Sequence, residues 1–322
     1  MRTSSLGIGL AVLSAATFGT SGSFASALMA AGWSPGAAVT TRIGVAAVIL
    51  TVPALVQLRG RWGLLRRSLP AVLAYGLVAV AGCQLFYFNA VEHLSVGVAL
   101  LLEYSGTLLV VGWLWLRHGQ RPRRLTVAGA VLAIGGLVLV LDVTGAQRIS
   151  AVGVLWGLGA AAGLAVYFVI SAHTDDPLPP MTMAWAGMVV GALALLLAGL
   201  VGALSLHATT ADVVFRGRQV SWVLPILGLS LVAAVIAYSA GIAAARRLGP
   251  RLASFLGLAE VLSAVLVAWL LLGQRPGVEQ LVGGVVVLAG IVLVRLDERS
   301  PADPGGCAVP VTADSPRSAE KV

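Results

Sequence analysis

The stretch GAVLAIGGLVLV, residues 129–140, returns as GGVVVLAGIVLV at residues 283–294, which is 154 residues further along the chain. The two stretches share a pair of glycines and a final Val-Leu-Val. The tetrapeptide GQRP at 119–122 returns at 273–276 with the same shift, and the halves align without gaps over three apolar segments. The chain is therefore predicted to consist of two related halves.

Composition indicates that both halves lie in a membrane. Of the 322 residues 58% are hydrophobic and 11% are charged, with a mean hydropathy of +0.96, whereas soluble domains are about 25% charged. The 39 glycines suit the close packing of membrane helices. The net charge of +8 does not indicate nucleic acid, because the arginines lie between apolar segments. Cys83 and Cys307 form neither a disulfide framework nor a metal site, and we expect no cofactor.

Hydropathy and the placement of Pro and Gly predict an all-α integral membrane protein with ten transmembrane helices. The first begins at Leu6 and is too long for the apolar core of a signal peptide, so we expect it to be retained. The predicted helices are 6–30, 35–57, 69–91, 94–116, 125–142, 150–171, 181–204, 221–244, 252–272 and 278–296.

The arginines predict the orientation of these helices. With the N-terminus in the cytoplasm, fourteen arginines fall inside: Arg2, Arg59, Arg61, Arg66, Arg67, Arg117, Arg121, Arg123, Arg124, Arg246, Arg247, Arg251, Arg295 and Arg299. Four fall outside: Arg148, Arg216, Arg218 and Arg275. The positive-inside rule then predicts a cell (inner or plasma) membrane protein with both termini cytoplasmic. The inside loop 172–180 carries no Lys or Arg and is neutral in this argument.

Five helices per half is an odd number, so the second half must insert upside down relative to the first. We expect two inverted five-helix repeats, at 1–142 and 150–298, and a disordered cytoplasmic tail at 299–322. Inverted repeats are typical of secondary transporters, whose substrate site lies near the membrane midplane. A duplicated channel would leave the same trace.

Several motifs resemble the EamA family of the drug/metabolite transporter superfamily: PGAAVTTR at 35–42 entering the second span, and GQRP closing the fourth and ninth. VALLLEYSG at 98–106 and SPGAAVTTR at 34–42 resemble the branch of threonine/homoserine exporters. The resemblance covers residues 6–298. It implies a ten-helix bundle with a central cavity that moves small metabolites, often outward. The chain departs from the family at Thr107 and Val261, where proline is usual.

Two carboxylates interrupt apolar spans. Glu103 is the only side chain from Leu94 to Leu116 that carries a charge in neutral water, in a run about 34 Å long as a helix, and Glu260 lies within GLAEVLSAVL at 257–266. A charge at this depth costs roughly 3 kcal/mol or more. Either carboxylate could bind a substrate ammonium or carry a coupling proton; the alternative is a structural bond to a neighbouring helix.

Arg42 is a third charge within a span. It could pair with Glu103 or hold a substrate carboxylate, or it could form a structural ion pair or reach outward to the interface.

Polar and aromatic residues on other spans suggest a cavity lining. Ser14, Thr17 and Ser21 form a stripe on the first span, and further candidates are Gln84, Tyr87, Phe88, Asn89, Tyr167 and Tyr238. Such groups would suit a small zwitterion. Each also fits interhelical hydrogen bonding or packing.

Two other motifs carry no site. GLGAAAG at 157–163 lies inside a span with no preceding strand, so its glycines are interpreted as helix packing. Asp175 and Asp176 have no ligand partners at metal spacing. We find no Walker A motif, no HExxH and no nucleophile elbow, so the sequence predicts neither an ATP-driven transporter nor an enzyme.

The sequence therefore predicts a secondary transporter that exports small metabolites such as amino acids by alternating access, with possible proton coupling left open. The alternatives are efflux of a lipophilic cation and, further off, an enzyme acting on lipid-linked substrates. The predicted partners are a small-molecule substrate and the lipid bilayer, with no nucleic acid. Protons as a further partner, and the choice between monomer and homodimer, are left open by the sequence.

Overall fold

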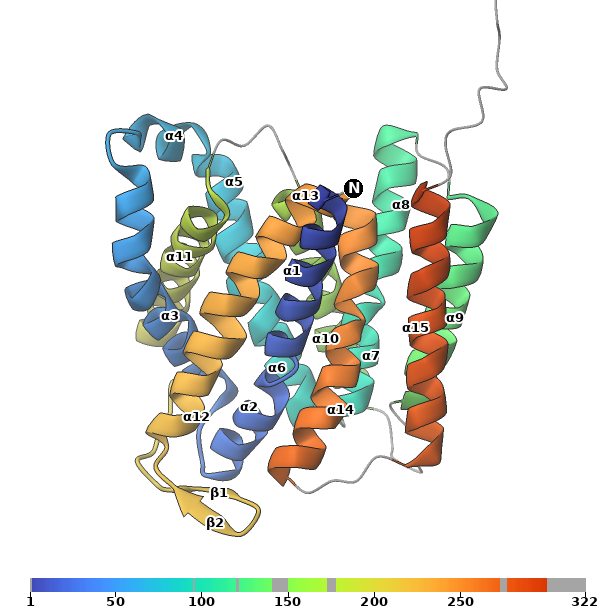
Figure 1. The fold of residues 1–322 in the computed structure, drawn as a ribbon. Helices are drawn as coiled ribbons and strands as arrows, with labels where there is room; N and C mark the ends of the chain where they lie inside the picture. Colours follow the sequence, from blue (N-terminus) through green and yellow to red (C-terminus); the bar gives the residue numbers. More distant parts are fainter. Residues whose placement is uncertain are drawn as a thin grey trace, which may run out of the picture.

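The computed structural model is a bundle of helices with one small hairpin at its end (Figure 1). It describes residues 2–94, 96–119, 122–140, 150–172, 178–272 and 277–299. The predicted tail from residue 300, the GQRP residues 120–121 and 273–276, and Asp175 and Asp176 lie outside the described residues.

Within the residues that the structure describes, the first half contains ten helical segments. They are α1 (Arg2–Phe18), α2 (Ser21–Ala30), α3 (Pro35–Leu58), α4 (Trp62–Arg67), α5 (Leu69–Ala74), the π-helix η1 (Tyr75–Gly82), α6 (Cys83–His93), α7 (Val96–Tyr104) and α8 (Gly106–His118), followed by α9 (Arg124–Val140). The second half contains α10 (Ala151–Ser171), α11 (Pro180–Leu200), β1 (Val213–Phe215), β2 (Arg218–Val220), α12 (Val223–Leu227), the π-helix η2 (Gly228–Ile236), α13 (Ala237–Gly257), α14 (Ala259–Leu272) and α15 (Val278–Arg299).

Among the residues that the structure describes, seven helical stretches are long and apolar enough to cross a membrane: Ser5–Ala30, Pro35–Leu58, Leu69–His93, Ala99–Arg117, Ala151–Ser171, Pro180–Leu200 and Val223–Gly257. Three shorter apolar helices, Arg124–Gly136, Ala259–Leu271 and Leu281–Val294, fall where further spans are predicted. Leu and Val side chains cover the outside of the bundle, with Val52, Leu155 and Leu200 among the exposed ones. An apolar outer surface of this kind requires lipid rather than water around it.

The stretch Val223–Gly257 is longer than one span because it contains a turn. Gly249 has φ 79° and ψ 164°, a conformation open to glycine and strained for other residues. Pro250 follows, and it lacks the N–H needed to continue the helix. The chain therefore reverses at Gly249, and the residues after it lead into α14, as the predicted boundary between 221–244 and 252–272 requires.

The helices of the two halves pack against each other in pairs. α1 packs against α13 and α6 against α10, while α3 packs against α11 and α9 against α15. Each pair joins one helix from each half, so the halves interleave instead of forming separate bodies.

Glycines allow the closest of these contacts. A Cβ atom built on Gly129 would lie 2.7 Å from the carbonyl oxygen of Gly290, and one on Gly136 would lie 2.8 Å from that of Gly283. The partner's number falls as the first number rises, so α9 and α15 run antiparallel (Figure 1). Gly153, Gly157, Gly159 and Gly163 pack α10 against α6 and α7 in the same way, which confirms the packing interpretation of GLGAAAG.

Several helices deviate from regular α geometry near the middle of the bundle. η1 and η2 are π-helical, a geometry that is rare and frequent at functional sites. Turns at Ser105 and Leu258 separate α7 from α8 and α13 from α14. These breaks occur beside Thr107 and Val261, without the proline that the family resemblance led us to expect there.

The hairpin β1–β2 was not predicted. Its two-residue turn, Arg216-Gly217, has positive φ at both positions, as hairpins with a right-handed twist require. Val213 packs with Leu28, Trp33 and Ile226 into a small apolar cluster. The hairpin lies at the opposite end of the bundle from the N-terminus, α4 and the end of α15 (Figure 1).

Candidate functional site

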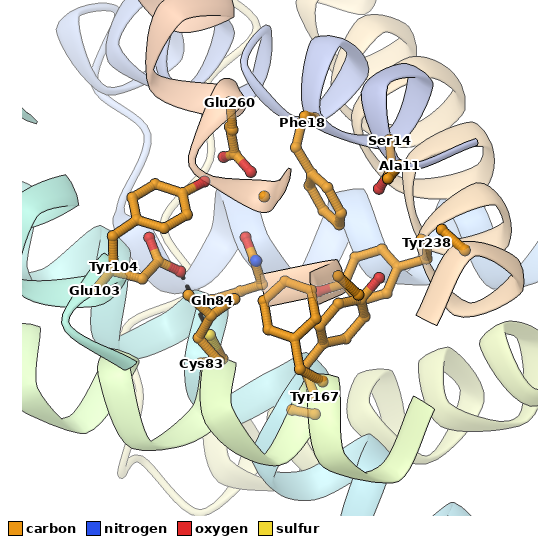
Figure 2. A pocket seen from close by; sticks show the side chains of 18 residues that line it. Ala11, Ser14, Phe18, Cys83, Gln84, Glu103, Tyr104, Tyr167, Tyr238 and Glu260 are labelled. Carbon is orange, nitrogen blue, oxygen red and sulfur yellow. Dashed lines mark hydrogen bonds between the residues drawn. The ribbon is translucent and has the colours of Figure 1, made fainter. Parts of the chain in front are cut away.

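A cavity of about 50 Å³ lies inside the bundle (Figure 2). Its walls come from α1, η1, α6 and α7 in the first half, and from α10, α13 and α14 in the second. The volume holds a few water molecules. The cavity is therefore a polar space between the halves, too small in this conformation for an amino acid.

Both predicted carboxylates reach this cavity. Glu103 lies in the last turn of α7, before the turn at Ser105, and Glu260 lies in the first turn of α14, after the turn at Leu258. The Cys83 thiol donates a long hydrogen bond of 3.5 Å to Glu103 Oε1. The N-terminus of α14 carries positive partial charge, which favours a carboxylate at Glu260. Two acidic groups from different halves thus line one cavity.

Aromatic rings form much of the remaining wall. Phe18 packs edge-on against Tyr238, with ring centroids 4.9 Å apart, and Tyr167 packs against Tyr238 at 5.6 Å. On the other side the Tyr104 side chain points toward Glu260 (Figure 2). Acidic groups among aromatic faces suit a ligand with a cationic amine, which both kinds of group attract.

Ser14 and Gln84 complete the group of predicted residues at the cavity. Ser14 Oγ donates to the Ala237 carbonyl oxygen at 2.8 Å, across the two halves. Gln84 is the second residue of α6, just after η1, and lines the cavity. The sequence analysis therefore named six residues that line it: Ser14, Gln84, Glu103, Tyr167, Tyr238 and Glu260.

Arg42 lies behind this wall. It is 1% exposed and does not line the cavity. Its Nη1 donates to Ser21 Oγ at 3.0 Å and to Gln84 Oε1 at 2.5 Å, and its Nη2 donates to the Ala233 carbonyl oxygen at 2.5 Å. Arg42 thus has neutral partners at these bonds, and its guanidinium acts on the cavity through Gln84.

Three other predicted residues do not line the cavity. Thr17 Oγ1 donates to the Leu13 and Ser14 carbonyl oxygens of its own helix, and Asn89 Nδ2 donates to the Leu85 carbonyl oxygen at 2.7 Å. Tyr87 is buried and packs against Phe88, with ring centroids 5.8 Å apart. Their structural interpretation, packing or bonding within the bundle, fits these contacts.

Phe18, Cys83 and Tyr104 line the cavity but were not among the predicted site residues. Tyr104 follows Glu103 directly in the sequence, and that adjacency is the one signal that could have indicated it. In the part of the chain that the structure describes, no group of three or more His, Cys, Asp or Glu side chains could hold a metal ion.

Comparison with known proteins shows which family the sequence matches and which solved structure shares its fold. The model of the EamA-like transporter family matches residues 5–142 and 151–296. A solved crystal structure shares the fold with a TM-score of 0.72 at 20% sequence identity, covering 93% of this chain and 99% of that one.

Curated relatives that the chain resembles come from bacteria and from the archaeon Archaeoglobus fulgidus. An uncharacterized inner membrane transporter of Salmonella typhimurium, YicL, is 22% identical over 73% of this chain and 75% of its own length. An uncharacterized transporter of Bacillus subtilis, YwfM, is 28% identical over 69% of this chain and 72% of its own. The pseudopaline exporter CntI of Pseudomonas aeruginosa is 37% identical over 23% of each chain.

Proposed function

Because the chain belongs to the EamA-like transporter family and is a multi-pass membrane transporter, we propose that it exports a small amino-acid-like metabolite by alternating access. Transport would be secondary, without ATP, and coupled to protons through the cavity carboxylates. The observation that carries this proposal is that Glu103 and Glu260, from different halves, line one cavity inside the bundle.

We propose that alternating access depends on an inverted repeat of five helices in each half, ten spans in all. Under the 154-residue shift Gly129 corresponds to Gly283 and Gly136 to Gly290. The contacts of Gly129 with Gly290 and of Gly136 with Gly283 therefore exchange with one another, as a two-fold axis between α9 and α15 would require. The pairing of α1 with α13 exchanges with that of α6 with α10 in the same way.

The small cavity supports a cycle in which the halves move. A substrate larger than a few waters requires the walls to separate, and rocking of one repeat against the other would open the site to each side in turn. The π-helices η1 and η2 adjoin the cavity residues Gln84 and Tyr238. Irregular segments of this kind are where we expect the helices to flex.

The orientation is also part of the proposal. The N-terminus, α4 with Arg66 and Arg67, and the end of α15 at Arg299 lie at one end of the bundle (Figure 1). By the positive-inside rule this end would face the cytoplasm and the β1–β2 hairpin would face outward. The short match to a named exporter supports outward transport.

The test is flux in proteoliposomes. Labelled threonine, homoserine and a wider amino-acid panel are followed with and without a pH gradient, for wild type and for Glu103→Gln. Glu92→Gln is the matched control, since Glu92 is exposed at the end of α6. We expect gradient-dependent flux that Glu103→Gln abolishes and Glu92→Gln retains. No flux of any amino acid in wild type would rule out the proposed substrate class.

A second candidate is efflux of a lipophilic cation. The rings of Phe18, Tyr104, Tyr167 and Tyr238 around two carboxylates favour it, because such a site attracts an organic cation whether or not it has a carboxylate. Adding tetraphenylphosphonium to the flux panel separates the two candidates: a cation efflux protein would move it, and an amino-acid exporter would not.

A further inference from the structure

We propose that Gln84, held by Arg42, gives the cavity a second, hydrogen-bond-donating end, so that the site selects substrates with both an amine and a carboxylate. The amine would lie at Glu103 and Glu260, and a carboxylate oxygen would accept from the Gln84 amide. This inference rests on the proposed function and deepens it, because it names amino acids in preference to simple amines.

The orientation of the Gln84 amide follows from its partner. Arg42 Nη1 lies 2.5 Å from Gln84 Oε1, and a guanidinium has donors but no acceptor. The opposite orientation would place the Gln84 NH2 group against another donor inside the bundle, where unmet hydrogen bonds are costly. The oxygen must therefore face Arg42, and the NH2 group is what Gln84 can offer to the cavity that it lines.

Arg42 is itself held from several sides. Its remaining bonds run to Ser21 in α2 and to the Ala233 carbonyl oxygen in η2, and its side chain is 1% exposed. Because it does not line the cavity, it acts as a positioning residue. Its positive charge also polarises the amide that it bonds, which strengthens the Gln84 N–H groups as donors.

Tyr167 supplies a second group at this end. It lines the cavity and is 3% exposed, and its hydroxyl lies beside Ser14. A hydroxyl has two acceptor lone pairs and one donor, so Ser14 does not use all of its hydrogen-bonding capacity. A polar group of a substrate near Gln84 and Tyr238, which packs against the Tyr167 ring, would bond to the remaining capacity.

The decisive variant is Gln84→Glu. Glutamate has the same shape and still accepts from Arg42, but it has no N–H group to donate. Proteoliposome flux is measured for the amino acid that wild type moves fastest and for the amine made by removing its carboxylate. Arg42→Met removes the positioning bond, Arg42→Lys restores a donor, and Asn89→Leu is the control, because Asn89 bonds only within its own helix. Size-exclusion profiles confirm that each variant is folded.

Wild type is expected to prefer the amino acid over the amine. Gln84→Glu is expected to lower amino-acid flux about tenfold or more, the effect of one lost hydrogen bond to a charged group, and to leave amine flux within about twofold. Arg42→Met shifts the ratio in the same direction, Arg42→Lys partly restores it, and Asn89→Leu does not change it.

Equal loss of both substrates in folded Gln84→Glu, or no loss of either, would overturn the inference while leaving the transporter proposal in place. A wild type that prefers the amine would overturn it in favour of cation efflux. A wild type that moves neither substrate would overturn the proposed function itself.

Discussion

The first half of the chain, residues 2–140, and the second, residues 150–299, share their irregular backbone but not the side chains of the cavity. η1 shifted by 154 residues covers 229–236, within one residue of η2 at Gly228–Ile236. The turn at Ser105 shifts to 259, one residue from the turn at Leu258. Deviations that recur at matching places are part of the architecture rather than local accidents.

The polar side chains at and behind the cavity, unlike the backbone, are not repeated between the halves. Glu103 corresponds to Gly257, Glu260 to Gly106, and Gln84 to Tyr238. Arg42 corresponds to Leu196. A symmetric backbone can rock between two equivalent states, whereas an asymmetric lining can hold a substrate in only one orientation. Under the proposed function, the comparison therefore separates the backbone that would move from the side chains that would bind substrate, and each can be changed alone.

The largest effect is expected from the carboxylates, because each corresponds to a glycine in the other half. Glu103→Gln and Glu260→Gln should each lower gradient-driven flux about tenfold to a hundredfold, because each removes a charged partner inside the bundle. If the two act on one bound substrate or proton, the double variant should be little worse than the poorer single variant. Proteoliposome flux measures all three, and fully multiplicative losses would contradict a shared site.

The next largest effect is expected at the close contact between α9 and α15. A Cβ on Gly136 would lie 2.7 Å from the Val287 backbone nitrogen, whereas one on Gly135 would meet nothing within 4 Å. Gly136→Ala should therefore force α9 from α15 and lower stability by about 1–3 kcal/mol. Gly135→Ala should leave stability unchanged or raise it slightly, since alanine favours helix. Thermal unfolding in detergent compares these neighbours, and equal melting temperatures would argue against the close crossing.

How much of this the sequence predicted depends on what kind of signal each feature leaves. Apolar length predicts spans directly, and the seven candidate spans fall at predicted places. A charge inside an apolar run is costly unless it serves a purpose, which is why Glu103 and Glu260 were singled out. The π-helices leave no such signal, because a change in backbone hydrogen-bond register requires no particular side chain.

Short polar side chains were the least predictable part of the site. Ser14 and Thr17 lie one turn apart, yet Ser14 bonds across to Ala237 while Thr17 bonds back to its own helix. Spacing along a helix cannot separate these outcomes, because a hydroxyl can always satisfy itself on a carbonyl three or four residues earlier. Aromatic residues such as Phe18 are equally ambiguous, since lipid, core and cavity all accept them.

A smaller effect is expected from the glycines that replace the carboxylates in the other half. A Cβ on Gly106 would lie 2.5 Å from the Ala161 carbonyl oxygen, whereas one on Gly257 would lie 3.0 Å from the Phe168 ring edge. Backbone cannot yield as a ring can, so Gly106→Ala should lower the melting temperature more than Gly257→Ala. Gly257 lines the cavity, and its variant should reduce flux at nearly unchanged stability. The reverse order in unfolding would contradict this assignment.

The smallest effect is expected from making the halves more alike at Cys83, which corresponds to Ala237. Its single S–H is shared between Glu103 Oε1, 3.5 Å from the sulfur, and the Ala160 carbonyl oxygen, 3.4 Å from it, and a thiol is a weak donor. Cys83→Ala should therefore change flux by about twofold or less. Cys83→Ser also tests whether a donor at this position affects flux, because it replaces the thiol with a hydroxyl, which is the stronger donor. If Cys83→Ala matched the loss in Glu103→Gln, the thiol would be holding the carboxylate in place, and the asymmetry between the halves would extend to this bond.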